Sequence, residues 1–248
     1  MCTVTWWCGT DGYELYFSRD EFKSRLPGLL PSEEVLDGVR YLAPSDGNTG
    51  GTWLWVNAYG LSVCILNQYP EAVPEPGPDA ISRGLLVRGL ASARDIATIT
   101  ARLQAMSLAR YAPFQLIALE PGSAGVVYTW HGRELLVQEN AREQLPFTSS
   151  SYLSDEIVQH RREKFAAVIA EKGDMSRDDL VDFHHAHDAG QGAHSVFMQR
   201  ADAETVSFSQ VVVKADQALL TYADKVSGRA AFAEPVVVKL KLNRNCLA

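Results

Sequence analysis

Met1-Cys2-Thr3-Val4-Thr5-Trp6-Trp7 and Tyr13-Glu14-Leu15-Tyr16-Phe17-Ser18 flank the turn Thr10-Asp11-Gly12 at the start of the chain. Both segments are rich in β-branched and aromatic residues and alternate as strands do. A hairpin returns the end of its second strand to the start of its first. We therefore expect a hairpin in which Cys2 begins the first strand and Ser18-Arg19-Asp20-Glu21-Phe22 lies beside it.

The rest of the chain alternates groups of strands with groups of helices. Residues 53–57 and 61–67 predict a second hairpin, after a stretch rich in arginine and proline at 25–44. Residues 69–79 hold five Pro or Gly and predict a loop. Helices are expected over 82–89, 92–106 with Ser92 as cap, 154–173, and 177–185 with Ser176 as cap. Further strands are expected over 114–119, 124–130, 133–138, 195–199, 205–213, 217–222 and 236–242.

This order of elements predicts the fold class. Strands, helices, strands, helices and strands follow one another without the regular alternation of βαβ units. The pattern favours an α+β protein with antiparallel sheets covered by helices. No linker or internal repeat divides the chain, so one domain over residues 1–248 is expected.

Composition narrows the classes of function. Acidic residues exceed basic ones, 30 to 23, and no long basic run supplies a surface for nucleic-acid phosphates. The first residues lack the pattern of a secretory signal, and no apolar run reaches the length of a membrane span. We therefore expect a soluble, cytoplasmic protein without nucleic-acid partners or stable membrane insertion. The sequence predicts no particular oligomeric state.

Cys2 carries the chemistry of most interest. The other cysteines, Cys8, Cys64 and Cys246, are too dispersed for a zinc knuckle or a dense disulfide framework, so reduced thiols are expected. A small side chain at position two lets an aminopeptidase remove Met1, which leaves a thiol and a free α-amine on one residue. An ordinary α-amine titrates at about pH 7.7–8.0 and can act as general base for that thiol. The competing interpretation is a small buried residue that opens an edge strand.

Arg19 and Asp20 are expected next to Cys2 because the hairpin brings them there. An arginine beside a thiol lowers the pKa of the thiol and holds an acyl oxygen, and a carboxylate orients an α-amine. The alternative is that the Arg-Asp-Glu run forms an ordinary solvated turn.

Five motifs occur in an order that resembles the NRDE family. They are Met1-Cys2, Ser18-Arg19-Asp20-Glu21-Phe22 with the nearby Arg25, Gly50-Gly51-Thr52-Trp53-Leu54, Leu66-Asn67-Gln68-Tyr69 and Ser82-Arg83-Gly84. This family includes the animal transport-and-Golgi-organization protein and many bacterial relatives. The start of the chain is also similar to the choloylglycine and penicillin V acylase branch of N-terminal-nucleophile hydrolases. The motifs cover residues 1 to about 90, with a looser likeness over 195–208.

The resemblance implies a fold and a set of site residues. The fold is a four-layer αββα sandwich with two antiparallel sheets, N-terminal-nucleophile hydrolase-like, as a single NRDE-type domain over residues 1–248. Cys2 would be the nucleophile, Arg19 would pair with thiol or substrate, and Asp20 would hold the amine. Asn67 matches a position where an amide donor helps form an oxyanion hole, although a turn residue at a strand end is an equal alternative.

The chain departs from the family pattern at several positions. Related acylases place their acid three residues after the arginine, where this chain has Phe22 beside Glu21, so the identity of the acid stays open. Ser18 replaces the asparagine of the family name. Ser150 stands where the family has a second polar asparagine, and a serine donates with shorter reach.

Histidines and glycines offer two further candidate sites. The stretch 182–188 contains three histidines at the end of a helix, where a cluster that interacts with the helix dipole is favoured over a metal site. No metal is therefore expected. The stretch 50–55 lacks the lysine and following helix of a phosphate-binding loop, so a tight turn is expected there. His194 is a candidate ligand-binding residue, because the resemblance places it near a pocket edge.

Two functions follow from this sequence. The first is a cysteine amidohydrolase or acyltransferase that acts through Cys2 on a small amide or acyl substrate, at carbon-nitrogen bonds other than peptide bonds, and requires no cofactor. The second is a binding or trafficking protein that uses the same pocket without chemistry. Relatives implicated in moving haem imply haem as its first ligand to test, with aromatic residues stacking on the porphyrin and a His or Cys on the iron.

Overall fold

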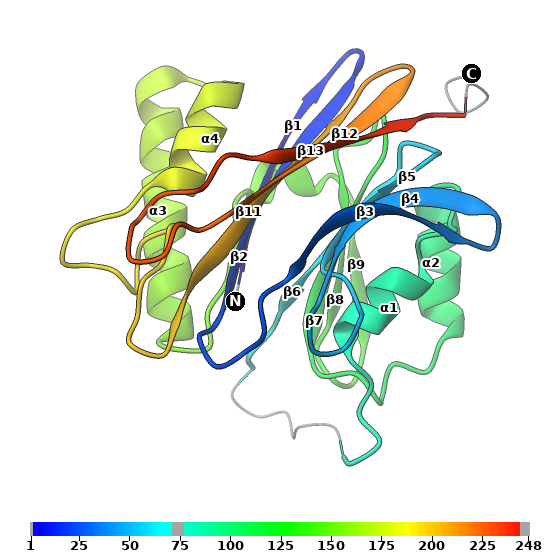
Figure 1. The fold of residues 1–248 in the computed structure, drawn as a ribbon, viewed down its shortest axis with the longest axis horizontal. Helices are drawn as coiled ribbons and strands as arrows, with labels where there is room; N and C mark the ends of the chain where they lie inside the picture. Colours follow the sequence, from blue (N-terminus) through cyan, green and yellow to red (C-terminus); the bar gives the residue numbers. More distant parts are fainter. Residues whose placement is uncertain (1, 71–76, 244–248) are drawn as a thin grey trace.

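The computed structural model describes residues 2–70 and 77–243. In these residues the chain forms two antiparallel sheets with helices on both outer faces (Figure 1). Helices α3 (Ser154–Lys172) and α4 (Arg177–His185) cover one sheet, and α1 (Arg83–Gly89) and α2 (Ile96–Ala105) cover the other. The α+β class and the four-layer αββα arrangement are thus confirmed.

Sheet A carries the start of the chain. Within the described residues it has six strands in the order β10-β1-β2-β11-β12-β13. Their bounds are β1 Cys2–Gly9, β2 Gly12–Phe22, β10 Phe147–Ser149, β11 Ala203–Val213, β12 Gln217–Asp224 and β13 Val236–Lys241.

The expected β1–β2 hairpin is confirmed, with Cys2 opposite Arg19 and Gly9 opposite Gly12. At Gly12 the backbone has φ +144°, and a Cβ there would meet the carbonyl oxygen of Val213 at 1.9 Å. Only glycine fits this close approach, which lets β11 pair along the whole of β2. The hairpin places Cys2 at one end of sheet A, between β2 and β10.

Sheet B has seven strands in the described residues, in the order β3-β4-β5-β6-β7-β8-β9. Their bounds are β3 Leu29–Leu36, β4 Val39–Ser45, β5 Leu54–Asn57, β6 Ser62–Asn67, β7 Phe114–Leu119, β8 Val126–Trp130 and β9 Leu135–Gln138. The expected hairpin of β5 and β6 and the strands β7 to β9 are confirmed.

The β3–β4 hairpin lies in the stretch 25–44, to which the sequence pattern assigned no element. Its turn is Asp37-Gly38, where both residues have positive φ, 50° and 79°, as a two-residue hairpin loop requires. The pattern did not reveal β3 because it is an edge strand with most side chains exposed, so its apolar residues do not alternate. The Asp-Gly pair was the available signal.

The helices agree with expectation except at one cap. Helix α4 begins with a capping box between Ser176 and Asp179, as expected, and α3 ends at Gly173. The cap of α2 is Asp95, which accepts a hydrogen bond from the Thr98 backbone, and not Ser92. Ser92 lies before the helix, where its hydroxyl donates to Asp37. A short 3-10 helix, η1 (Ala141–Gln144), precedes β10.

Residues 195–199 do not form the expected strand. Their apolar side chains are buried, but the backbone turns back on the preceding loop: the N–H of Phe197 donates to Ala186 and that of Gln199 to Gly192. Among these residues, only Gln199 makes a β-bridge, to Glu204 of β11, so the buried apolar residues 196–198 mimic a strand without strand pairing. Of the expected loop 69–79, residues 71–76 lie outside the described residues.

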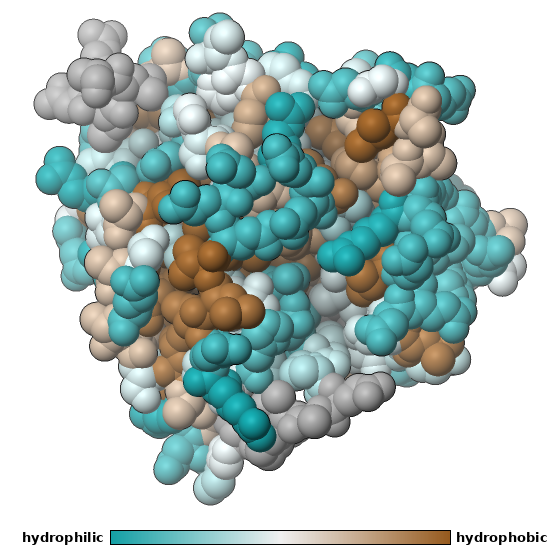
Figure 2. Space-filling model, turned by 180° about the vertical axis from the view of Figure 1, so that it is seen from behind, coloured by the Kyte–Doolittle hydropathy of each residue, from teal (hydrophilic) through white to brown (hydrophobic). Residues whose placement is uncertain are grey.

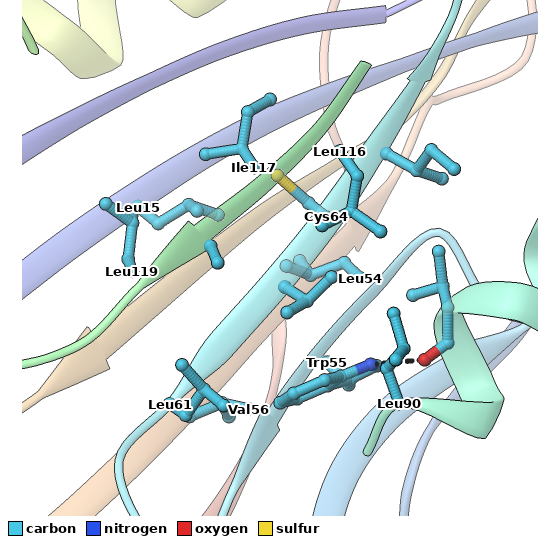
Figure 3. Close-up of a cluster of buried hydrophobic side chains, with 14 of the residues drawn as sticks. Leu15, Leu54, Trp55, Val56, Leu61, Cys64, Leu90, Leu116, Ile117 and Leu119 are labelled. Atoms are coloured by element: carbon cyan, nitrogen blue, oxygen red, sulfur yellow. Dashed lines mark hydrogen bonds between the residues drawn. The ribbon is translucent and has the colours of Figure 1, made fainter. Parts of the chain in front are cut away.

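The main core lies between the two sheets. Side chains on alternate positions of β1 and β2, such as Val4 and Leu15, meet those of sheet B. Figure 3 shows part of this cluster, where Leu15 lies with Cys64 and Ile117. Trp55 is fully buried and its indole N–H donates to the Val87 carbonyl at 2.6 Å, which ties α1 to sheet B.

The opposite face of the β1–β2 hairpin is lined by polar residues beneath α3 and α4. Thr3, Thr5 and Ser18 are buried there. On the outer surface, the face in Figure 2 shows hydrophobic residues in separate patches between hydrophilic ones. No helix in the described part of the chain is long and apolar enough to cross a membrane.

Candidate functional site

A cavity of about 530 Å³ opens at the end of the sheets where β1 begins. It brings together four of the residues that the sequence singled out. These are Cys2, Arg19, Asp20 and Asn67. Its apolar wall includes Trp53, Ile65 and Ile81, and its charged rim includes Glu21, Arg25, Asp46 and Arg83.

Cys2 is the first residue of β1 and is 8% exposed, and its register partners are Arg19 on β2 and Ser149 on β10. Burial raises the pKa of its thiol above the ordinary value, and the Asp20 carboxylate adds to this effect. The backbone N–H of Asp20 and the guanidinium of Arg19 act in the opposite direction. The thiol is therefore neutral near pH 7 and needs a base to become a nucleophile.

Arg19 is a buried cation with a fixed position. Its Nη2 donates to Asp46 at 3.0 Å and to Glu21 at 3.3 Å. Its guanidinium carbon lies 4.2 Å from the ring centroid of Trp53, a cation–π contact. These contacts fix Arg19 at the register position opposite Cys2.

Asp46 is a site residue that the sequence analysis missed. Its Oδ2 accepts from Arg19 and Arg25, and its Oδ1 accepts from Arg25 and from the Asn48 and Thr49 backbones. Although burial acts to raise its pKa, these donors bring it below the ordinary value. The Asp-Gly-Asn-Thr-Gly run at 46–50 signals only a turn, so its link to Arg19 could not be read from the sequence.

Asp20 lies on the strand position next to Arg19 and is 2% exposed. Its Oδ1 accepts a hydrogen bond from the Thr205 hydroxyl at 2.6 Å. Within the described residues its Oδ2 has no hydrogen-bond partner, and Nη1 of Arg161 lies 3.6 Å away. Burial raises the pKa of this carboxyl, and Arg161 and Thr205 oppose the effect. A buried carboxylate with one unsatisfied oxygen has room for one more donor.

Arg161, on α3, is the second residue that the sequence analysis missed. It is 1% exposed. Nη1 donates to the hydroxyls of Thr3 and Thr148, while Nη2 donates to the Ser195 carbonyl. The arginine thus links α3 to two strands beside Cys2 and to the loop after α4.

Asn67 ends β6 and its Nδ2 donates to the Tyr69 hydroxyl at 3.2 Å. The two serines at the departures from the family pattern point elsewhere. The Ser18 hydroxyl bonds to Nδ1 of His184 at 2.7 Å, and the Ser150 hydroxyl donates to the Tyr152 carbonyl at 2.6 Å. Among the described lining residues, Asn67 therefore supplies the side-chain amide of the cavity.

His194 lies outside the Cys2 cavity. It lines a separate hollow of about 490 Å³ along α3, where its Nε2 is 2.7 Å from Glu156. The histidines of 182–188 have different partners from one another: His184 is buried against Thr5 and Ser18, and His187 contacts the Phe197 carbonyl. In residues 2–70 and 77–243, no three His, Cys, Asp or Glu side chains are grouped to hold a metal ion.

Solved structures with this arrangement are distant in sequence. A penicillin V acylase from Agrobacterium tumefaciens has a TM-score of 0.58 at 10% identity, covering 100% of this chain and 88% of that one. A mutant conjugated bile acid hydrolase from Clostridium perfringens has a TM-score of 0.57 at 12% identity, covering 98% of each chain. The Caenorhabditis elegans ortholog of N-acylethanolamine-hydrolyzing acid amidase has a TM-score of 0.61 at 12% identity, covering 86% of this chain and 92% of that one.

These likenesses concern the fold, which is that of N-terminal-nucleophile hydrolases. No curated protein matches the chain significantly. A family model described as Transport and Golgi organisation 2 matches residues 1–223. The chain therefore belongs to the Transport and Golgi organisation 2 family, the NRDE family that its motifs resemble.

Proposed function

We propose that the protein is a cysteine amidohydrolase or acyltransferase in which Cys2, freed of Met1, attacks the carbonyl of a small amide or acyl substrate. The observation that carries this proposal is the unsatisfied Oδ2 of Asp20. The fold and the hydrolases that share it support the general class of reaction.

The Asp20 carboxylate is suited to hold a new α-amine. Leaving a buried carboxylate oxygen without a donor costs free energy. Asp20 is adjacent to Arg19, the register partner of Cys2, so removal of Met1 would create an ammonium donor next to this acceptor. The carboxylate would stabilise the ammonium form and so make the amine a stronger base.

The proposed reaction needs only the groups of Cys2 and a water. The α-amine takes the thiol proton, and the thiolate attacks the carbonyl carbon. The tetrahedral intermediate collapses as the C–N bond breaks, and the leaving amine takes the proton from the α-ammonium. Water, deprotonated by the α-amine, then attacks the thioester, the C–S bond breaks, and the thiolate is reprotonated as the carboxylic acid leaves.

The cavity provides groups for the other parts of the substrate. Asn67 Nδ2 is a donor for the oxyanion, and the Arg19 guanidinium is a fixed positive charge beside the thiol. Trp53 and Ile65 form an apolar wall of the cavity, suited to the acyl side. A cavity of about 530 Å³ is of the size that binds small molecules.

The first experiment is intact-protein mass spectrometry with a cysteine-reactive acylating probe. We expect the purified chain to lack Met1 and to gain one adduct, which Cys2→Ala abolishes. Cys64→Ala is the matched control, because Cys64 is also buried but does not line the cavity, and it should keep the adduct. Retained Met1 with an unreactive Cys2 would reject the proposal.

Turnover is then tested with a substrate panel taken from proteins of the same fold. Penicillin V, a conjugated bile acid and an N-acylethanolamine each contain an amide of the proposed class. Hydrolysis of any of them should disappear in Cys2→Ala. Cleavage that persists in this variant would mean that another group does the chemistry.

Haem binding in the same cavity is the alternative function. The described lining offers Cys2 and Tyr69 as iron ligands and no histidine, and the raised pKa of the Cys2 thiol makes it a poor ligand. These residues do not fit haem well, so we place the hydrolase function first. Haem added as a competitor of the acylating probe tests the hydrolase function against haem binding. A Soret shift together with loss of the Cys2 adduct would favour a haem carrier.

A further inference from the structure

The apolar stripe that docks α3 on the sheet is interrupted by a charge. The buried residues of this helix are Ile157, Arg161 and Phe165, spaced four apart on one face. Ile157 and Phe165 pack as such a face requires, but Arg161 buries a guanidinium where an apolar side chain would cost nothing in desolvation. A buried cation at this position calls for a partner that uses its charge.

We infer that Arg161 is a positioning residue that keeps the Asp20 carboxylate charged and directs its free oxygen towards the amine of Cys2. This inference rests on the proposed function and names a residue that controls the strength of its general base, the α-amine of Cys2. Arg161 touches no substrate in this scheme and acts through Asp20.

The contacts of Arg161 explain why its position is fixed. Hydrogen bonds of 2.8–3.0 Å reach the Thr3 and Thr148 hydroxyls and the Ser195 carbonyl, all neutral acceptors. Asp20 is its ion-pair partner, at 3.6 Å, too long for a good hydrogen bond. Oδ2 of Asp20 therefore feels the charge of Arg161 but remains available to another donor.

In the described part of the chain, few charged groups other than Arg161 act on the pKa of the Asp20 carboxyl. The titratable group of β1 near Asp20 is Cys2, whose thiol pKa the Asp20 charge raises. On α4, His184 bonds to Ser18, two residues from Asp20 on β2, and is held neutral because burial lowers its pKa to about 3. From β11 the facing side chain is the uncharged Thr205. Burial raises the pKa of Asp20, and the charge of Arg161 is the largest opposing influence.

Removal of the charge should therefore raise the pKa of the Asp20 carboxyl further, because burial would act on it without the opposing charge of Arg161. Loss of an opposite charge at this distance shifts a carboxyl pKa by about 1–3 units. A protonated Asp20 no longer stabilises the ammonium of Cys2. The acylation rate of Cys2 should then fall in the pH range where Asp20 is ionised in wild type but protonated in the variant, and it should recover at higher pH.

The test is the rate of Cys2 acylation from pH 5 to 9 in the full chain, measured by mass spectrometry. In Arg161→Met we expect the acid limb of the profile to move up by about 1–3 pH units, with roughly tenfold loss per unit below it. Arg161→Lys keeps the charge and should restore the wild-type limb. Thr148→Val removes a hydrogen bond of Arg161 and the bonds of this hydroxyl to Thr3 and to the Cys2 carbonyl, but no charge. It should therefore leave the pH of the limb in place even if the rate falls equally at every pH.

A merely structural Arg161 would give a different pattern. The rate of Arg161→Met would then fall equally at every pH, which would overturn the inference. The carboxyl titration of Asp20, followed by NMR and assigned with Asp20→Asn, is the second measurement. An equal titration midpoint in wild type and Arg161→Met would also overturn it. If wild-type Cys2 is unreactive, the proposed function fails, whereas this titration still decides the role of Arg161.

Discussion

Replacement of Asp46 by asparagine should loosen Arg19 and destabilise the fold. The side chain of Asp46 is 10% exposed and that of Arg19 is 6% exposed, so their ion pair is shielded from water. Asp46→Asn keeps the shape of the side chain but removes the charge that Arg19 and Arg25 share. One amide N–H would face the guanidinium groups instead of an oxygen.

The magnitude follows from the contacts. Removal of one partner of a buried ion pair costs about 3–5 kcal/mol. Glu21 remains 3.3 Å from Arg19, and Arg25 is 35% exposed and can be solvated. We therefore expect a loss of about 2–4 kcal/mol in the free energy of unfolding, or roughly 2–4 °C in Tm for each kcal/mol.

Urea denaturation at pH 7 measures this loss. Glu33→Gln is the matched control, because the Arg40–Glu33 pair is 43% and 41% exposed and should contribute less than about 1 kcal/mol. The stabilisation by Asp46 should also depend on pH, and the direction follows from its pKa. The pKa of Asp46 is lower in the folded protein than its ordinary 3.8, so its stabilisation is complete above pH 4 and is lost as pH falls through the folded value.

Two results would refute this reasoning. The first is an Asp46→Asn variant as stable as wild type at pH 7, which would mean that Glu21 and solvent replace the carboxylate fully. The second is a difference between the two proteins that persists undiminished below the folded pKa of Asp46. The Cys2 adduct provides a functional readout, because a loosened Arg19 should slow its formation.

Two further predictions concern the elements that carry the site. The pKa of His184 is about 3 in the fold against an ordinary 6.5, so between these pH values the unfolded chain binds a proton that the folded chain does not. Wild type should therefore lose stability on acidification across this window. His184→Gln should be less stable at pH 7 but should lack this pH-dependent loss in denaturation measured from pH 7 to 4. Gly12→Ala should prevent stable folding, since its Cβ would lie 1.9 Å from the Val213 carbonyl oxygen. Gly38→Ala has open space at φ +79° and should cost only about 1 kcal/mol of stability. Similar thermal denaturation of the two variants would contradict the close approach at Gly12.

The sequence determined the local elements and the start of the site. Alternating residues around a turn fix a hairpin without help from the rest of the chain, because strand register follows from the turn. Cys2 opposite Arg19 is a consequence of that register. Helix α4 was equally predictable, since its capping box is contained in four consecutive residues.

Only the tertiary structure decided which distant groups complete the site. Asp46 comes from a loop of the other sheet. Arg161 is 141 residues from Asp20, on a helix whose apolar spacing does not reveal which sheet the helix covers. His194, expected near the pocket, lines a different hollow because the loop after α4 turns back on itself. Periodicity reports which face of an element is buried, but the partner across that face is set by the docking of α3 and the two sheets.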